Sequence, residues 1–263
     1  MKKLFKISAV FLFVLIVFSA CGRNESVSGK ITSFPPYGER VVTAIGDSIA
    51  AGYGLESQED NYLTLFSDNI GAVLNNDAVS GYDSGEVLKS LSDEKTAADI
   101  KNADAIVVSV GGNDFFHRKD IMIDALKNAL LHGEGFFPEE VTNIYDEYEK
   151  NLSRIIDEIK NMNPDAYIIV QTVYNPFLKQ TLNFSYINVG KTANRYVTRL
   201  NDSIKNVCKT KNRVFVFDVA QEMNEDAENF YGTDEKLDIH PTKHGHATLA
   251  RVFTEKFNGL LKD

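Results

Sequence analysis

Residues 41–48 read VVTAIGDS, a short apolar run that ends in Gly46, Asp47 and Ser48. The β-branched side chains and the near absence of polar groups are typical of a buried strand in a parallel sheet. In open sheets that alternate strands with helices, ligands bind beyond the carboxyl ends of the strands. The stretch therefore predicts an α/β fold, and it places a serine where it can act as a nucleophile if a base reaches it.

From Arg40 onward, short apolar segments alternate with segments of helical periodicity. We predict five strands, at residues 41–45, 72–76, 105–110, 166–173 and 214–218. Helical spacing is clearest at residues 140–160, 187–209 and 243–261. This alternation predicts one five-stranded parallel sheet that helices cover on both faces, with right-handed crossovers between the strands.

Residues 115–140, directly after the third predicted strand, are the least regular part of the chain. They contain Phe115-Phe116, a stretch with helical spacing at 120–132 and the sequence GEGFFP at 133–138. A long loop at this edge can cover a substrate site as a lid or wall. Alternatively, the phenylalanines only pack beneath the loop, and the sequence leaves both interpretations open.

Residues 1–20 have the pattern of a secretory signal peptide. Three lysines within the first six residues precede an apolar stretch from Ala9 to Phe18, which is too short to span a bilayer comfortably. The sequence FSACG at 18–22 then resembles a bacterial lipobox, although leucine is usual where Phe18 stands. In that case the chain is cleaved before Cys21, and Cys21 becomes a lipidated N-terminus.

We therefore expect an extracytoplasmic lipoprotein that is anchored to the bacterial cell membrane through Cys21, with a tether at 21–39. Gly, Ser, Asn and two adjacent prolines make up much of that tether. The alternative is a plain signal peptide with Cys21 as an incidental thiol. The second cysteine, Cys208, lies beside Val207 in a helical pattern, which predicts a small buried apolar side chain.

The formal net charge of −9 at pH 7 limits the choice of partners. Binding of nucleic acid requires clustered Lys and Arg, so this acidic chain is not expected to bind it. The same charge disfavours attraction to anionic lipid headgroups. Association with a membrane is therefore expected to come from the lipid on Cys21.

Four motifs contain residues that could take part in catalysis. Each lies just past a predicted strand or just before the last predicted helix. They are Gly46-Asp47-Ser48, Ala78-Val79-Ser80-Gly81, Gly111-Gly112-Asn113-Asp114 and His240-Pro241. Because the carboxyl ends of parallel strands share one edge, the four motifs can converge there. Asp83 and Glu86 have the spacing of a capping box for the helix that follows the second motif.

Acyl transfer assigns a role to each motif. His240 can take the proton from the Ser48 hydroxyl, which is a poor nucleophile without a base. Negative charge then develops on the carbonyl oxygen and requires preorganised donors. The candidate donors of this oxyanion hole are the backbone N–H of Ser48, the backbone N–H of Gly81 and the side-chain amide of Asn113.

This ordered set resembles the SGNH (GDSL-type) hydrolase family, whose Ser, Gly, Asn and His match Ser48, Gly81, Asn113 and His240. The resemblance covers about residues 40–255, and residues 174–177 (YNPF) also resemble bacterial lipoprotein members. It implies a flavodoxin-like three-layer α/β/α sandwich at 40–263. It further implies hydrolysis of esters or thioesters without a metal or another cofactor.

One departure from the family concerns the triad acid, which usually lies three residues before the histidine. Leu237 occupies that position here, and Asp238 lies two residues before His240. Asp238 can reach the imidazole through a shifted loop, a backbone carbonyl can orient His240 instead, or the enzyme is impaired. Asp234 is a more distant candidate.

Several other polar residues have structural explanations. Asp47 is expected to stabilise its turn, Asp114 to cap the following segment, and His117 and His132 to lie on the surface. A metal site at His240, His244 and His246 is not expected, because Pro241 suits the first turn of a helix and leaves His240 outside it. His244 and His246 are two residues apart and cannot share a helical face.

The leading hypothesis is a monomeric serine hydrolase that cleaves a carboxylic ester, with Ser48, His240 and Asp238 as the catalytic residues. The substrate can be a lipid, a small ester or an acylated glycan. An acyltransferase that uses the same site is the second hypothesis. The third is a non-catalytic lipoprotein that binds lipid or glycan, which the leucine at 237 motivates.

Overall fold

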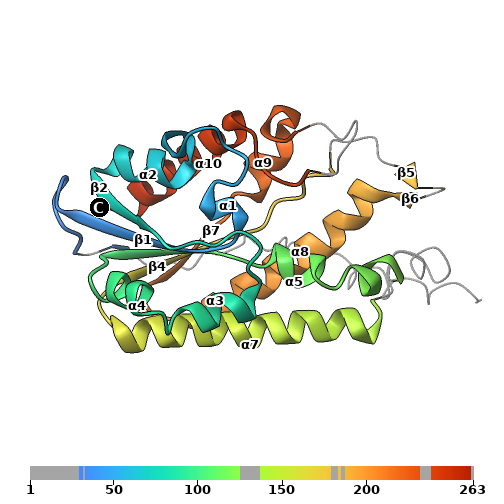
Figure 1. Cartoon of the computed structure of the whole chain (residues 1–263), viewed down its shortest axis with the longest axis horizontal. Coiled ribbons are helices and arrows are strands. Elements are labelled where there is room, and N and C mark those ends of the chain that lie inside the picture. Colours follow the sequence, from blue (N-terminus) through green and yellow to red (C-terminus); the bar gives the residue numbers. More distant parts are fainter. Residues whose placement is uncertain are drawn as a thin grey trace, which may run out of the picture.

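A sheet forms the central layer of the molecule, as Figure 1 shows for the computed structural model. The sheet has five strands, all parallel. The structure describes residues 30–31, 33–124, 137–178, 183–184, 187–231 and 238–261. The predicted signal peptide at 1–20 and Cys21 lie outside these residues, so both stay predictions.

The strands are arranged in the order β2-β1-β3-β4-β7 and pair in parallel throughout. Their bounds are β1 (Arg40–Gly46), β2 (Ala72–Asn76), β3 (Ala105–Ser109), β4 (Tyr167–Gln171) and β7 (Val214–Phe217). All five predicted strands are confirmed to within two residues at either end. Because β2 lies on one side of β1 and β3 on the other, the strand order reverses there. Such a switch point is where open α/β sheets bind ligands.

Helices cover both faces of the sheet, which confirms the predicted three-layer α/β/α sandwich (Figure 1). The helices packed on one face are α3 (Ser84–Ser90), α4 (Glu94–Lys101), α7 (Glu139–Met162) and α8 (Val189–Cys208). Those on the other face are α2 (Tyr62–Ile70), α9 (Ala220–Glu225) and α10 (Lys243–Leu261). Short helical turns in the loops are α1 (Ser48–Ala51), η1 (Gln58–Asp60), α5 (Gly112–Phe116) and η2 (Ala227–Asn229).

The alternation of side chains along the strands creates two separate cores. In β3, Ile106 and Val108 belong to the core under α7, whereas Val107 belongs to the core under α10. The apolar stripe of α7 recurs every three or four residues, and its buried members begin at Val141 and end at Ile159. The predicted helices at 140–160 and 243–261 are thereby confirmed.

The predicted helix at 187–209 begins two residues too early. A small antiparallel ribbon of β5 (Asn183–Phe184) and β6 (Ile187–Asn188) stands before α8. An apolar residue at 187 fits both a strand and the helical spacing that follows, so periodicity alone does not place the boundary.

The irregular segment after β3 combines the two interpretations that the sequence left open. Phe115 packs against Tyr145 with ring centroids 4.9 Å apart, and Phe116 is 46% exposed and lines a pocket. Residues 119–124 are helical, and the remainder of the predicted helix at 120–132 lies outside the described residues. Thus one phenylalanine belongs to the core and the other to a pocket wall.

All members of the two cores lie between Ile31 and Leu261, so a chain that starts at residue 22 retains the whole core. The Ile31 N–H donates to the Leu260 carbonyl (3.1 Å), which ties the entry of the chain to the end of α10. Cys208 is buried as predicted, and burial raises the pKa of its thiol to about 12. Among the described residues, no helix is both long and apolar enough to cross a membrane.

Candidate active site

The nucleophile candidate, Ser48, follows the end of β1, where Gly46 pairs with Ser109 of β3. Gly46 has φ +152°, and a Cβ there would lie 2.1 Å from the Ser109 carbonyl oxygen, so only glycine fits. The Asp47 N–H donates to the same oxygen (3.0 Å). Ser48 then begins the single turn of α1, and it lines the pocket beyond the carboxyl edge of the sheet.

Asp47 stabilises this turn, as predicted, by accepting a hydrogen bond from the Ile49 N–H (3.0 Å). Its side chain is buried. Burial raises the pKa of the Asp47 carboxyl to about 7 despite that hydrogen bond, and the nearby Asp114 carboxylate adds to the rise. Asp47 is therefore a buried acid directly behind the serine.

The structure brings Ser48, His240 and Asp238 together. The Ser48 Oγ lies 3.0 Å from His240 Nε2, and His240 Nδ1 lies 2.7 Å from the Asp238 Oδ1. In this arrangement the Nδ1–H donates to the carboxylate, which leaves Nε2 free to accept the serine proton. This is the hydrogen-bonded order that acyl transfer to a serine requires.

The two-residue spacing between Asp238 and His240 has a local explanation. The Asp238 Oδ1 also accepts the backbone N–H of His240 (2.9 Å), so the side chain folds back over its own turn. One oxygen thereby holds both the backbone and the ring of the histidine. Of the three alternatives from the sequence, the structure supports the shifted loop, and Leu237 and Asp234 lie outside the described residues.

Tyr53 also contacts the histidine, and the sequence analysis missed it. Its ring centroid lies 4.6 Å from that of His240, at an interplanar angle of 42°. The helical turn α1 ends at Ala51, and the Tyr53 N–H donates to the Ser48 carbonyl (3.0 Å). This hydrogen bond keeps Tyr53 next to the nucleophile. The glycines on either side of Tyr53 have positive φ and were the available signal for such a turn.

The oxyanion-hole candidates follow three neighbouring strands at this edge, and Ser48 and Asn113 line the same pocket. Gly81 has φ +90° and open space where a Cβ would be, so its backbone can approach a substrate. The Asn113 side-chain amide donates to the Tyr82 carbonyl (2.9 Å), which occupies one of its two hydrogens. Within the described part of the chain, the backbone N–H groups of Ser48 and Gly81 have no acceptor.

Asp114 does not cap the segment that follows it, which corrects the prediction. Its buried carboxylate accepts hydrogen bonds from the hydroxyl and the backbone N–H of Ser84, at the start of α3. Burial raises the pKa of Asp114 to about 6. The Asp83–Glu86 capping box at the same helix start is confirmed. Asp114 thus fixes α5, which carries Asn113, against the segment that carries Gly81.

The pocket at this edge is small, at about 50 Å³. Its lining includes Ser48, Val110, Asn113, Phe116, Tyr174 and Ile239. The Tyr174 hydroxyl donates to the Ile239 carbonyl (3.4 Å), which supports the loop next to His240. The pocket therefore has room for the reacting group and little of the rest of a substrate.

The three C-terminal histidines have three different hydrogen-bond partners. His244 lies 3.0 Å from the Asp226 carboxylate on the surface. His246 is buried and accepts the Tyr62 N–H (3.2 Å), and burial lowers the pKa of its imidazole to about 4. His117 is exposed as predicted, and His132 lies outside the described residues.

Pro241 does not begin the last helix, which corrects a second prediction. It pairs with Phe230 in an isolated antiparallel bridge, and α10 begins only at Lys243. The Phe230 ring in turn packs on Tyr174 with centroids 5.1 Å apart. The bridge thus holds the residue that follows His240.

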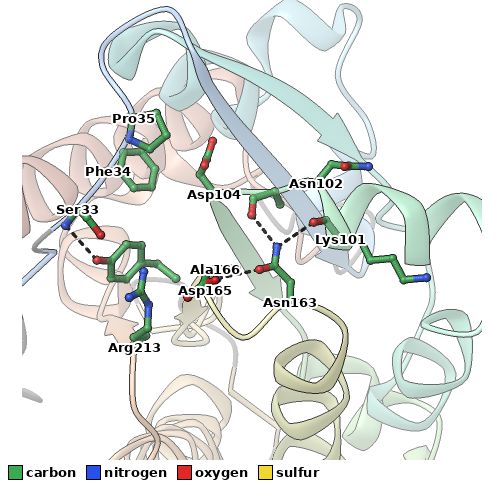
Figure 2. A pocket seen from close by; sticks show the side chains of 12 residues that line it. Ser33, Phe34, Pro35, Lys101, Asn102, Asp104, Asn163, Asp165, Ala166 and Arg213 are labelled. Carbon is green, nitrogen blue, oxygen red and sulfur yellow. Dashed lines mark hydrogen bonds between the residues drawn. The ribbon is translucent and has the colours of Figure 1, made fainter.

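A larger cavity, of about 530 Å³, lies at the opposite, amino edge of the sheet, where Figure 2 shows its lining. Its polar side chains support the fold. Asp104 accepts the Val41 N–H (2.8 Å), and the Asn163 amide donates to the Ile100 and Ala103 carbonyls (2.9 and 2.8 Å). None of the four sequence motifs contributes to this lining. Size alone therefore does not identify the active site.

Known proteins resemble this chain in sequence and in fold. The model of the GDSL-like lipase/acylhydrolase family matches residues 44–248. The protein YpmR of Bacillus subtilis strain 168, described as uncharacterised, is 26% identical over 99% of both chains. The spore germination lipase LipC of Bacillus licheniformis is 23% identical over 84% of this chain and 97% of its own. The crystal structure of the lipase Lip_vut3 from a goat rumen metagenome has the same fold, with a TM-score of 0.64. It is 18% identical and covers 82% of this chain and 97% of its own.

Proposed function

We propose that this chain, which belongs to the GDSL-like lipase/acylhydrolase family, hydrolyses esters through an acyl intermediate on Ser48. The observation that carries the mechanism is the hydrogen-bonded series from Ser48 Oγ through His240 to Asp238, with separations of 3.0 and 2.7 Å. A nucleophile, a base and a group that orients the base are what this chemistry requires.

The first half of the reaction transfers the acyl group to the enzyme. The Ser48 oxygen attacks the ester carbonyl carbon while His240 Nε2 takes the hydroxyl proton. The negative charge on the carbonyl oxygen is stabilised by the N–H groups of Ser48 and Gly81 and by the second amide hydrogen of Asn113. When the tetrahedral intermediate collapses, the C–O bond to the alcohol breaks and His240 donates its proton to the departing oxygen.

Water completes the reaction by the same route in reverse. His240 takes a proton from a water molecule, whose oxygen attacks the acyl carbon. Collapse of the second tetrahedral intermediate breaks the bond to Ser48, and the proton returns to the serine oxygen. Asp238 stabilises the imidazolium in both halves, because its carboxylate is 2.7 Å from Nδ1.

Lipid esters are one substrate class for this site, since the Bacillus licheniformis relative is a lipase. We propose that the protein is exported and anchored to the bacterial cell membrane by a lipid on Cys21. The signal-peptide and lipobox patterns of residues 1–22 support this location. The chain enters the domain at the amino edge, where Ser33, Phe34 and Pro35 line the larger cavity (Figure 2). The catalytic edge is therefore on the far side of the domain from the segment at residues 33–35.

Hydrolysis of p-nitrophenyl acetate, butyrate and octanoate by residues 22–263 tests the function. We expect turnover by the unmodified protein and a loss of at least about a thousandfold in Ser48→Ala, since the nucleophile is absent. Ser92→Ala is the matched control, because Ser92 is exposed and only donates to the Lys89 carbonyl (2.8 Å). Equal activity of Ser48→Ala and Ser92→Ala would contradict the mechanism.

The anchor has its own test, which is incorporation of labelled palmitate into the full chain expressed in a bacterium. Labelling that disappears in Cys21→Ser supports lipidation. Labelling that persists in this variant argues against Cys21 as the attachment site.

A further inference from the structure

Large exposed apolar side chains gather at one edge of the molecule. The described residues include eight such side chains, and six of them follow the carboxyl ends of strands. These six, which we call the apolar rim, are Tyr53, Val79, Phe116, Ile123, Leu178 and Tyr231. The other two are Tyr37, which precedes β1, and Val73, which lies in the edge strand β2.

Each of the five strands contributes to the rim. Tyr53 follows β1, Val79 follows β2, Phe116 and Ile123 follow β3, and Leu178 follows β4. Among the described residues, Tyr231 is the first exposed large apolar residue after β7. Because all five strands are parallel, the segments after them leave the sheet at the same edge. The rim is therefore a consequence of the topology rather than of one loop.

Contacts place four of the six rim residues next to the catalytic residues or to the segments that hold them. The Tyr53 ring packs on His240, and Phe116 lines the small pocket. Tyr231 directly follows Phe230, the residue that pairs with Pro241. The Val79 N–H donates to the Gly46 carbonyl (3.0 Å), two residues before Ser48. Whatever covers the rim thus also covers the nucleophile.

The small volume of the pocket indicates which kind of ligand can bind across the apolar rim. Pockets that enclose a whole small molecule measure about 300–1,000 Å³, whereas this one holds about 50 Å³. Most of an amphiphilic ester must then lie outside the pocket, across the rim. A rim that draws on five loops fits an extended surface better than a single acyl chain, and exposed apolar patches of this kind mark interaction sites.

The charge of the chain restricts the surface further. With a formal net charge of −9, the protein is repelled by anionic headgroups. We therefore propose that the catalytic edge docks through the apolar rim onto a lipid surface with zwitterionic or uncharged headgroups and takes its ester from that surface. The proposal rests on ester hydrolysis at Ser48 and adds the physical state of the substrate.

Binding to phosphatidylcholine vesicles tests the docking without requiring catalysis. Residues 22–263 with Ser48→Ala are sedimented with the vesicles, so that no ester is cleaved during the measurement. The rim variant combines Val79→Ser with Tyr231→Ser. The control combines Val73→Ser with Tyr37→Ser, which makes the same substitutions at exposed residues away from the rim.

We expect the rim variant to lower the partition coefficient about tenfold, because it removes two apolar side chains from the interface, and the control to stay within about twofold. Phosphatidylglycerol vesicles should bind the parent less than phosphatidylcholine vesicles do. Equal binding of the two variants, no binding of the parent, or a preference for the anionic vesicles would overturn the proposal. So would a dimer in gel filtration that the rim variant dissociates, since the rim would then be an interface between two copies.

The same proteins with Ser48 intact separate this proposal from the proposed function. Turnover of p-nitrophenyl acetate, which is soluble, reports on the catalytic residues alone. The ratio of vesicle-ester turnover to acetate turnover should fall about tenfold in the rim variant and not in the control. Loss of acetate turnover with intact vesicle binding would refute the catalytic mechanism and leave the docking surface standing, whereas an unchanged ratio would refute the docking.

Discussion

Replacement of Asp238 by asparagine should slow ester hydrolysis while leaving the fold intact. The carboxylate accepts both the ring Nδ1–H and the backbone N–H of His240, at 2.7 and 2.9 Å. A hydrogen bond to a charged group contributes about 1.5–3 kcal/mol. The Asp238 side chain is 37% exposed, so solvent screening places its contribution toward the lower end of that range. About 2 kcal/mol corresponds to a fall in kcat of roughly 30-fold.

Steady-state hydrolysis of p-nitrophenyl butyrate by residues 22–263 measures this effect. Asp226→Asn is the matched control, because Asp226 also accepts a histidine ring proton, from His244 at 3.0 Å, but at the surface away from Ser48. We expect the control to keep the activity of the unmodified protein. If Asp238→Asn stays within twofold of that activity, or if both variants lose activity equally, Asp238 does not orient the catalytic histidine.

Three further predictions concern the site and its support. Asn113→Ala should lower kcat about 100- to 1,000-fold in the same ester assay with a nearly unchanged KM, because it removes one donor to the oxyanion; an unchanged kcat would exclude Asn113 from that role. Burial lowers the pKa of His246 from 6.5 to about 4, so the unfolded chain binds its proton first as the pH falls. The resulting stabilisation is complete above pH 6.5 and lost by pH 4, and it amounts to about 3 kcal/mol. Urea unfolding should therefore show a smaller loss of stability between pH 7 and 4 in His246→Asn, whose side-chain oxygen takes the place of Nδ1 and can still accept the Tyr62 N–H. Equal losses would contradict the argument. Gly46→Ala should lower the melting temperature or prevent folding, because the added methyl group would lie 2.1 Å from the Ser109 carbonyl oxygen; a melting temperature equal to that of the unmodified protein would show that the strands can move apart.

The inner strands β3 and β4 could be predicted because they are buried on both faces. Such strands have uninterrupted apolar sequences, as at residues 105–109 and 167–171, and glycines or polar residues mark their ends. The start of α8 could not be placed, because the short ribbon before it has no periodicity of its own. A pattern of two residues is too short to distinguish a strand from a helix.

Site residues that directly follow a strand could be predicted from the sequence. Residues whose role depends on contacts with distant parts of the chain could not. Ser48, Gly81 and Asn113 each stand just beyond a strand, so the parallel topology brings them to one edge. Asp114 was predicted to cap the segment that follows it, because its actual partner, Ser84, is 30 residues away in the sequence. Tyr53 and His240 lie near opposite ends of the domain's sequence, so their contact has no local sequence signal apart from the two glycines beside Tyr53.

The central claim is that Ser48 is a nucleophile activated by His240, whose Nε2 lies 3.0 Å from the serine oxygen. Reaction of residues 22–263 with a fluorophosphonate, followed by mass spectrometry of the digested protein, tests it most directly. We predict one adduct, located on Ser48, which is absent from Ser48→Ala and forms far more slowly in His240→Ala. A protein that hydrolyses esters but carries the adduct on another residue, or carries none, would contradict the account.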